Sequence, residues 1–166
     1  NTELQNKDQH SETVTVETAL TDTDGKVIRR ASGKLSLKPG EKKTIRQQIE
    51  IKNPKLWSPD SPYLYRVQSR VKKGNQSIDG GITRIGIRQA EFRGKDGFWL
   101  NGKPFGQLVG ANRHQDFAYV GNALPNSQQW RDAKRLRDAG CTIIRVAHYP
   151  QDPSFMDACD KLGMFV

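Results

Sequence analysis

The chain has 166 residues, of which 34% are hydrophobic, and its formal net charge is +9 at pH 7. A hydrophobic content this low is still above that of disordered chains, so we expect one large domain or two small ones. No stretch approaches the roughly 20 apolar residues that a membrane span needs, and the polar residues 1–9 lack the apolar core of a signal peptide. We therefore expect no membrane partner and no targeting segment in a chain whose first residue, Asn, suggests an excised piece. The cellular location stays open.

The positive charge raises nucleic acid as a partner, but its distribution argues against that class. Lysines occur singly along the first half, and they neither gather on a predicted helix nor alternate with aromatic residues. We interpret them as a solvated sheet face and expect no nucleic acid partner, while a polyanion stays an alternative that salt-dependent retention would reveal. These residues are Lys34, Lys38, Lys42, Lys43, Lys52 and Lys55.

Two cysteines, Cys141 and Cys159, are too few for a disulfide framework. Both occur in apolar patterns, so we expect buried free thiols. No pair of residues has the spacing of a metal site, and we expect no metal.

The first half predicts short strands separated by turns. Residues 13–20 alternate, with apolar side chains on one face, and residues 26–31, 34–37, 44–51, 63–71 and a stretch ending at 87 follow. Gly25 lies in a predicted turn where it can take a positive φ, and residues 2–9 can hold the stub of a further strand. About six strands without a helix predict an immunoglobulin-like all-β sandwich over residues 1–88.

Residues 53–65 form a loop in which three prolines fix an extended path. We expect Trp57 to close one end of the sandwich. A platform that stacks against a sugar is the functional alternative.

The second half, residues 89–166, opens with a predicted hairpin whose Asn101-Gly102 pair is typical of a type I′ turn. Strands are predicted at 107–112 and 142–146, and residues 164–166 begin a third. The intervening helix starts with Asn126 or Ser127 as its cap and stops at Gly140. A second helix is capped by Asp152 with Pro153 in its first turn, and it ends at Gly163.

Strands alternating with helices predict a parallel sheet. The first strand is not followed by a glycine fingerprint, so the first part of a truncated TIM (β/α)8 barrel fits better than a dinucleotide-binding fold. About a quarter of such a barrel leaves an unpaired strand edge, and we expect a homo-oligomer or a loosely ordered second half.

The run from Arg145 through His148 and Pro150, followed by Phe155, Asp160 and Gly163, resembles a signature of glycoside hydrolase family 2. Thr142 and Val146 depart from that pattern, which has Asn and a small residue there. The stretches 56–59, 62–65 and 110–114 also resemble parts of the same family.

The resemblance implies a retaining exo-glycosidase that acts on terminal β-D-galactosides in oligo- or polysaccharides. The form of residues 112–117 looks closest to β-galactosidases, while β-glucuronidases, β-mannosidases and a non-catalytic sandwich interaction module remain alternatives. Family members use two glutamates on later barrel strands, and the only Glu after residue 88 is Glu91. We therefore expect no catalytic residue and no hydrolysis in this chain alone, and no cofactor in it, although a divalent or monovalent cation is possible in the full enzyme.

The resemblance also implies which residues bind the carbohydrate substrate. Arg145 would lie beside the nucleophile and keep it ionised, because a nearby cation lowers the pKa of a carboxylate. His114 and His148 would hydrogen-bond to sugar hydroxyls, and Asn112 and Asp116 are further candidates.

Overall fold

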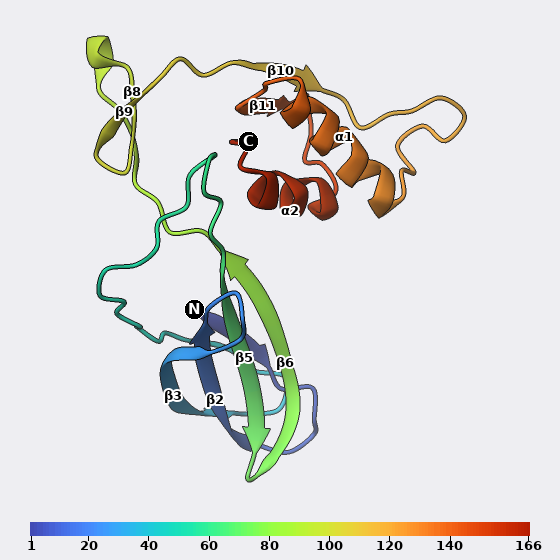
Figure 1. The fold of residues 1–166 in the computed structure, drawn as a ribbon. Helices are drawn as coiled ribbons and strands as arrows, with labels where there is room; N and C mark the ends of the chain where they lie inside the picture. Colours follow the sequence, from blue (N-terminus) through green and yellow to red (C-terminus); the bar gives the residue numbers. More distant parts are fainter. The chain divides into compact units, whose positions relative to one another are not determined.

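The computed structural model describes all 166 residues, and the chain divides into two compact units, each with its own packing. Unit 1 comprises residues 1–54 and 65–85, and unit 2 comprises residues 55–64 and 86–166. The chain is mostly β-structure with few helices, and Figure 1 shows both helices near the carboxyl terminus. Neither helix has the length and apolar character that crossing a membrane would need.

Unit 1 consists of antiparallel strands. Its four-stranded sheet has the order β3-β2-β5-β6, and β1 pairs with β4 in a separate two-stranded sheet. Alternation along β2 turns Val14 and Val16 inward, where Val14 packs with Leu37 and Val71. The strands are β1 (Thr2–Gln5), β2 (Glu12–Thr21), β3 (Val27–Leu37), β4 (Lys42–Ile45), β5 (Tyr65–Lys73) and β6 (Gln76–Ile85).

The strand predicted at 44–51 is wrong over most of its length, because regular pairing ends at Ile45. A side chain replaces the backbone ladder beyond that point. Gln47 Nε2 donates to the Val16 carbonyl oxygen at 3.1 Å, and Gln47 Oε1 accepts from the Thr18 hydroxyl at 2.7 Å. The segment is therefore held beside β2 without joining a sheet.

Unit 2 holds an antiparallel sheet, a parallel strand pair and two helices. Strands β7 (Ala90–Phe92), β8 (Phe98–Leu100) and β9 (Lys103–Gly106) pair in that order, with a short 3-10 turn at Gly94–Asp96. Asn101 and Gly102 have φ values of 53° and 76°, which confirms the predicted type I′ geometry.

The α/β part of unit 2 follows the predicted order. β10 (Gly110–Arg113) leads through α1 (Asn126–Asp138) to β11 (Ile143–Val146) and then α2 (Pro153–Leu162). β10 and β11 pair in parallel, as predicted, and Phe165 forms a parallel bridge with Ile143. The structure contains no closed barrel.

Trp57 does not close the end of the sandwich, because its loop belongs to unit 2. Its side chain is 1% exposed, its Nε1 donates to the Asp160 carbonyl oxygen at 2.8 Å, and its ring meets that of Phe165 edge-on at 5.3 Å. A ring this buried cannot stack on a sugar, so that alternative is also wrong. Residues 55–64 thus pack with unit 2, although they precede the predicted division at residue 88.

Of the two predicted helix caps, one is wrong and the other is confirmed. Pro125 occupies the cap position of α1 and no side chain caps that helix, so neither Asn126 nor Ser127 has the predicted role. Asp152 caps α2, because its Oδ1 accepts from the Ser154 backbone N–H at 2.7 Å, and hydrogen bonds from Ser154 lower the pKa of Asp152.

The glycines that end the two helices allow a matched pair of substitutions. Gly140 and Gly163 both have a positive φ, 89° and 75°, and alanine at either position costs about 1 kcal/mol for that conformation. An added Cβ at Gly140 meets open space, whereas one at Gly163 collides with the backbone of Pro59. Gly163→Ala is therefore expected to lower the free energy of unfolding of unit 2 by about 2 kcal/mol more than Gly140→Ala. Urea unfolding followed by tryptophan fluorescence measures it, since all three tryptophans lie in unit 2, and equal losses would contradict the packing around Gly163.

The two thiols differ in burial. Cys159 is fully buried, as predicted, and burial raises its pKa to about 12, whereas Cys141 is only partly buried. At pH 8 about one Cys159 in ten thousand is a thiolate, and only the thiolate reacts. We expect Ellman's reagent to label Cys141 first, and Cys159 only in urea or as the pH rises toward 12. Two equally fast thiols in the folded chain would be the opposite result.

Candidate functional site

Four of the five predicted site residues lie at the carboxyl ends of β10 and β11. The parallel register places Asn112 beside Arg145 and Arg113 beside Val146. His114 follows the first strand, and His148 follows the second after one residue. Because both strands run in the same direction, their carboxyl ends meet at one edge of the sheet.

The two imidazoles face each other at this edge. The ring centroids of His114 and His148 are 5.5 Å apart at an interplanar angle of 85°, and the Tyr149 ring lies 6.4 Å from that of His114. Tyr149 is held in place because its hydroxyl oxygen accepts from the Gln115 backbone N–H at 2.8 Å. Both histidines are exposed, so their ring nitrogens are accessible to a ligand.

Asn112 and Arg145 are both exposed and line an open hollow on one face of the strand pair. The floor of this hollow is small or apolar, and its lining residues are Leu108, Gly110, Ala111, Asn112, Ile143 and Arg145. A cation and an amide over an apolar floor can bind a polar ligand with an apolar side, such as a pyranose ring.

Asp116 lies in the loop after β10 and is exposed. No hydrogen bond or ion pair joins its carboxylate to the other four predicted residues. The structure therefore groups four of the candidates at the ends of β10 and β11 and places the fifth in the loop that follows β10.

Arg113 is a residue of this site that the sequence reasoning missed. Its side chain is 6% exposed, and its Nη2 donates to Gln129 Oε1 at 2.8 Å and to Asp132 Oδ2 at 2.9 Å. Its Nη1 donates to Gln151 Oε1 at 2.5 Å, and the guanidinium lies 4.1 Å from the Phe155 ring centroid. An ion pair this buried is costly to break, so Arg113 fixes the ends of both strands against the helices.

The backbone of Arg113 takes part in the same network. Its carbonyl oxygen accepts from Gln151 Nε2 at 2.6 Å and from the Ala147 backbone N–H at 2.9 Å. Strand alternation was the available signal, because it turns Arg113 to the face opposite Asn112, where a charged side chain needs partners. The peptide bond between Ala147 and His148 in this turn is cis.

Glu91 is the only glutamate after residue 88, and it lies on β7. Its carboxylate accepts from Arg93 Nε at 2.8 Å and from Gln89 Nε2, and the hydrogen bond from Arg93 lowers the pKa of Glu91. No cluster of three or more His, Cys, Asp or Glu side chains could hold a metal ion.

An antiparallel unit followed by parallel βα units, with polar side chains at the strand ends, fits a glycosyl hydrolase, and comparison with known proteins shows which family it is. The family model described as "Glycosyl hydrolases family 2" matches residues 1–88. The model "Glycosyl hydrolases family 2, TIM barrel domain" matches residues 92–166. The chain therefore belongs to glycosyl hydrolase family 2, with a sandwich domain and the start of a TIM barrel domain, and the resemblance found in the sequence is confirmed.

Relatives of two activities are similar to this chain. A β-galactosidase of Thermoanaerobacter pseudethanolicus is 45% identical over 75% of the chain and 17% of its own length. A putative β-glucuronidase of Formosa agariphila is 41% identical over 70% of the chain and 14% of its own length.

A solved structure covers nearly the whole chain. The crystal structure of a Bacteroides uniformis β-glucuronidase is 33% identical and has a TM-score of 0.91 over 98% of this chain, which is 20% of that protein. The chain thus spans about a fifth or less of the length of these three relatives.

Proposed function

We propose that the full-length protein carrying this chain is a retaining exo-glycosidase that removes terminal β-D-galactose from oligo- or polysaccharides. The observation that carries the proposal is the grouping of Asn112, Arg145, His114 and His148 at one edge of β10 and β11. Family membership supports the reaction class, and the 45% identical β-galactosidase supports the sugar. In this proposal unit 1 is an immunoglobulin-like sandwich, and β10, α1, β11 and α2 begin a (β/α)8 barrel.

The proposed roles follow from the chemistry of these side chains. A retaining glycosidase needs two carboxyl groups about 5 to 5.5 Å apart, one as acid/base and one as nucleophile. Arg145 would lie beside the nucleophile and hold it ionised, since an opposite charge within about 4–6 Å favours the charged form. The exposed rings of His114 and His148 would hydrogen-bond to sugar hydroxyls. Asn112, beside Arg145, and Asp116, in the loop after β10, are weaker candidates.

This chain supplies neither carboxyl group. Glu91, on β7, is hydrogen-bonded to Arg93, and the acidic residues of α1 and α2 are aspartates rather than glutamates. We infer that the 166-residue chain alone does not hydrolyse glycosides, and that its contribution is one wall of the sugar pocket. Release of nitrophenol from an aryl β-D-galactoside by the purified chain would overturn this inference.

A β-glucuronidase is the second candidate. The 41% identical putative β-glucuronidase and the β-glucuronidase structure with a TM-score of 0.91 favour it. The exposed Arg145 could also pair with the carboxylate of a uronic acid.

The two candidates are separated by kcat/KM values of the full-length protein. The two substrates are 4-nitrophenyl β-D-galactoside and 4-nitrophenyl β-D-glucuronide. We expect the galactoside to be preferred by at least about 100-fold, because a site whose polar groups match one sugar leaves some of them unpaired when the other sugar binds. Preference for the glucuronide would select the second candidate, and no turnover of either would refute both.

A further inference from the structure

The outer face of the four-stranded sheet in unit 1 collects cations that are far apart in the sequence. Register places Arg30 and Gln68 on either side of Ala19, and Ser32 and Arg70 on either side of Glu17. Side chains directly opposite each other in a sheet share a face, and so do residues two positions apart along a strand. The residues paired with Thr15 and Thr21 therefore extend the same surface. The cations of this surface, called the basic face here, are Arg30, Lys34, Arg66, Arg70, Lys72 and Arg84.

Charge on the basic face is poorly balanced. Glu17 is its only acidic side chain, and it forms an ion pair with Lys72 at 3.1 Å. Strand pairing thus gathers arginines that the sequence distributes over three strands. Like charges packed this closely repel one another, so an anion would relieve the repulsion.

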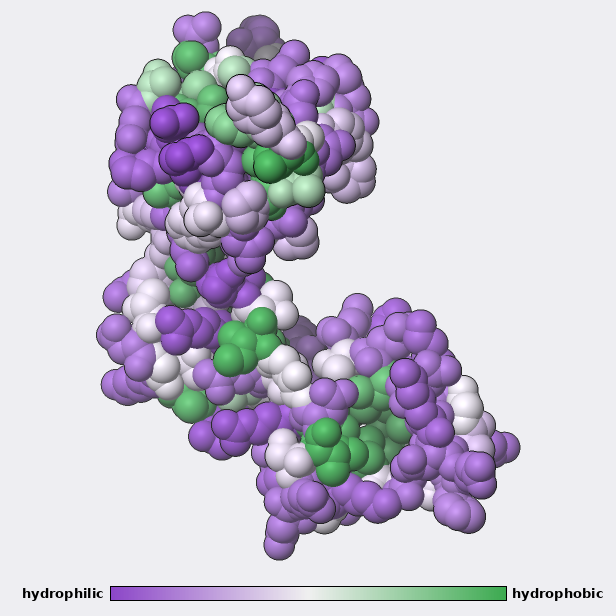
Figure 2. Space-filling model, turned by 90° about the vertical axis from the view of Figure 1, so that its right-hand side faces the viewer, coloured by the Kyte–Doolittle hydropathy of each residue, from purple (hydrophilic) through white to green (hydrophobic).

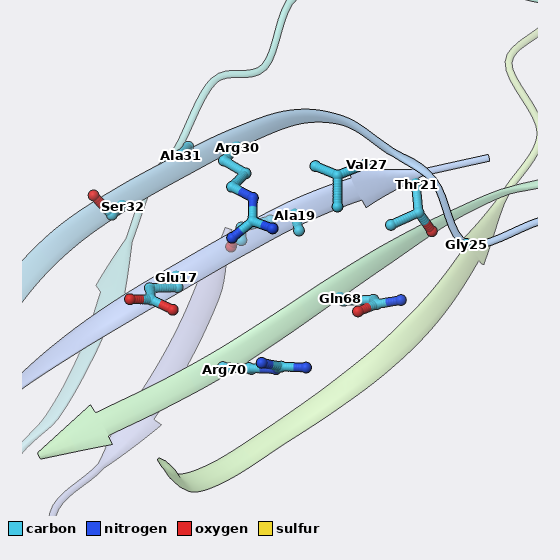
Figure 3. Close-up of a pocket in the computed structure, with 11 residues that line it drawn as sticks. Glu17, Ala19, Thr21, Gly25, Val27, Arg30, Ala31, Ser32, Gln68 and Arg70 are labelled. Carbon is cyan, nitrogen blue, oxygen red and sulfur yellow. The ribbon is translucent and has the colours of Figure 1, made fainter. Parts of the chain in front are cut away.

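A hollow lies in the middle of the basic face, and Figure 3 shows its lining side chains coming from β2, β3 and β5. It exists because Ala19 has a short side chain between Arg30 and Gln68. The side chains of Arg30, Arg70 and Gln68 therefore line this hollow together. Its lining also contains Thr21, which is 1% exposed and whose hydroxyl Oγ1 is buried without a hydrogen-bond partner.

This hollow is separate from the polar ends of β10 and β11, since its lining residues all belong to unit 1. The face of the molecule in Figure 2 is mainly hydrophilic, and its apolar residues gather in a few separate patches. The basic face consists of the residues paired across the sheet with Thr15, Glu17, Ala19 and Thr21, and none of them is aromatic. A surface without aromatic rings offers no platform for bases or bare sugar rings to stack on.

We propose that the basic face binds an anionic polysaccharide, a chain of sugars that carries carboxylate or sulfate groups. Arginine forks form paired hydrogen bonds with both anions. The polar side chains of Gln68 and Ser32 can bond to the hydroxyls between them. The basic face would hold a polymeric substrate to the protein, independently of which sugar the full-length enzyme releases.

The proposal is tested by measuring binding of the purified chain at 0.15 M NaCl (about physiological ionic strength) to four polymers. Polygalacturonate carries carboxylates, dextran sulfate carries sulfates, dextran is neutral, and duplex DNA represents nucleic acid. We expect binding to one or both anionic polysaccharides, weakening as salt is added, and no binding to dextran. The stronger of the two identifies the preferred anion.

Two matched double variants separate a built site from net charge. Arg30→Gln with Arg70→Gln is expected to weaken binding by about tenfold or more. Arg29→Gln with Arg46→Gln removes the same charge from residues outside the hollow and is expected to have little effect. Arg30→Lys with Arg70→Lys keeps the charge but loses the paired donors of the guanidinium. Its binding is expected to be intermediate between that of the two double glutamine variants.

Three results would overturn the proposal. They are no binding to either anionic polysaccharide, equal weakening in the two glutamine variants, and tighter binding of duplex DNA than of both anionic polysaccharides. Unchanged circular dichroism of each variant checks that unit 1 is still folded.

Discussion

Gly110→Ala is expected to lower the free energy of unfolding of unit 2 by about 3 kcal/mol and to disrupt the pairing of β10 with β11. Gly110 begins β10 opposite Ile143, and an added Cβ would collide with the backbone carbonyl oxygen of Ile143. A backbone atom in a sheet cannot move aside as a flexible side chain can. The strands must therefore separate, and Asn112 would lose its place beside Arg145.

Gly106→Ala is the matched control for this substitution. Gly106 lies four residues earlier on β9, with a φ of 87° and open space where the Cβ would be. It is expected to cost about 1 kcal/mol for its conformation alone. Urea unfolding with tryptophan fluorescence compares the two, and a Gly110→Ala loss no larger than the control would show that β10 and β11 are not paired this closely.

Arg145→Met in the full-length protein is expected to lower kcat by about 100-fold or more, because a charge fixed beside the reacting groups contributes strongly to stabilising a charged transition state. If Arg145 keeps a carboxylate nucleophile ionised, its removal raises the pKa of that carboxylate. The acidic limb of the kcat/KM profile should then move to higher pH by about 1 to 3 units. This shift separates an electrostatic role from a structural one.

Arg135→Met provides the control for Arg145. Arg135 is exposed on α1, so its loss removes the same charge away from the strand ends. It is expected to leave kcat and the pH profile unchanged. An Arg145 variant that keeps the pH profile of the unaltered protein would remove the proposed electrostatic role.

Local patterns predicted much of the fold. The alternation along residues 13–20 became β2, the Asn101-Gly102 pair became a type I′ turn, and Asp152 capped α2. Each of these features depends on residues that are close in the sequence, so the chain itself contains the signal. Parallel pairing of β10 with β11 also followed, because a short helical connection between two strands leaves few other topologies.

Contacts between particular side chains that are far apart in the sequence could not be predicted. Trp57 is buried by Phe165 and Asp160, more than a hundred positions away, and Gln47 replaces a backbone ladder by binding to Val16. The hydrogen bonds of Arg113 also reach residues up to 38 positions later. The same holds for the basic face, whose cations looked scattered until strand register aligned them.

For the candidate site, the sequence supplied the residues and the structure supplied their grouping. His114 and His148 follow successive strands, and the parallel register brings their rings to 5.5 Å. Asp116 was predicted by the same reasoning but lies in the loop after β10. The roles of all five residues stay predictions until a sugar is seen in place.

The most direct test of the central claim is a crystal structure of the full-length protein with a slowly hydrolysed β-galactoside bound. We expect sugar hydroxyls within about 2.6–3.2 Å of ring nitrogens of His114 and His148, a hydrogen-bonding distance. We also expect the Arg145 guanidinium beside the carboxylate that attacks the sugar. A sugar bound productively elsewhere, with the ends of β10 and β11 empty, would contradict the account.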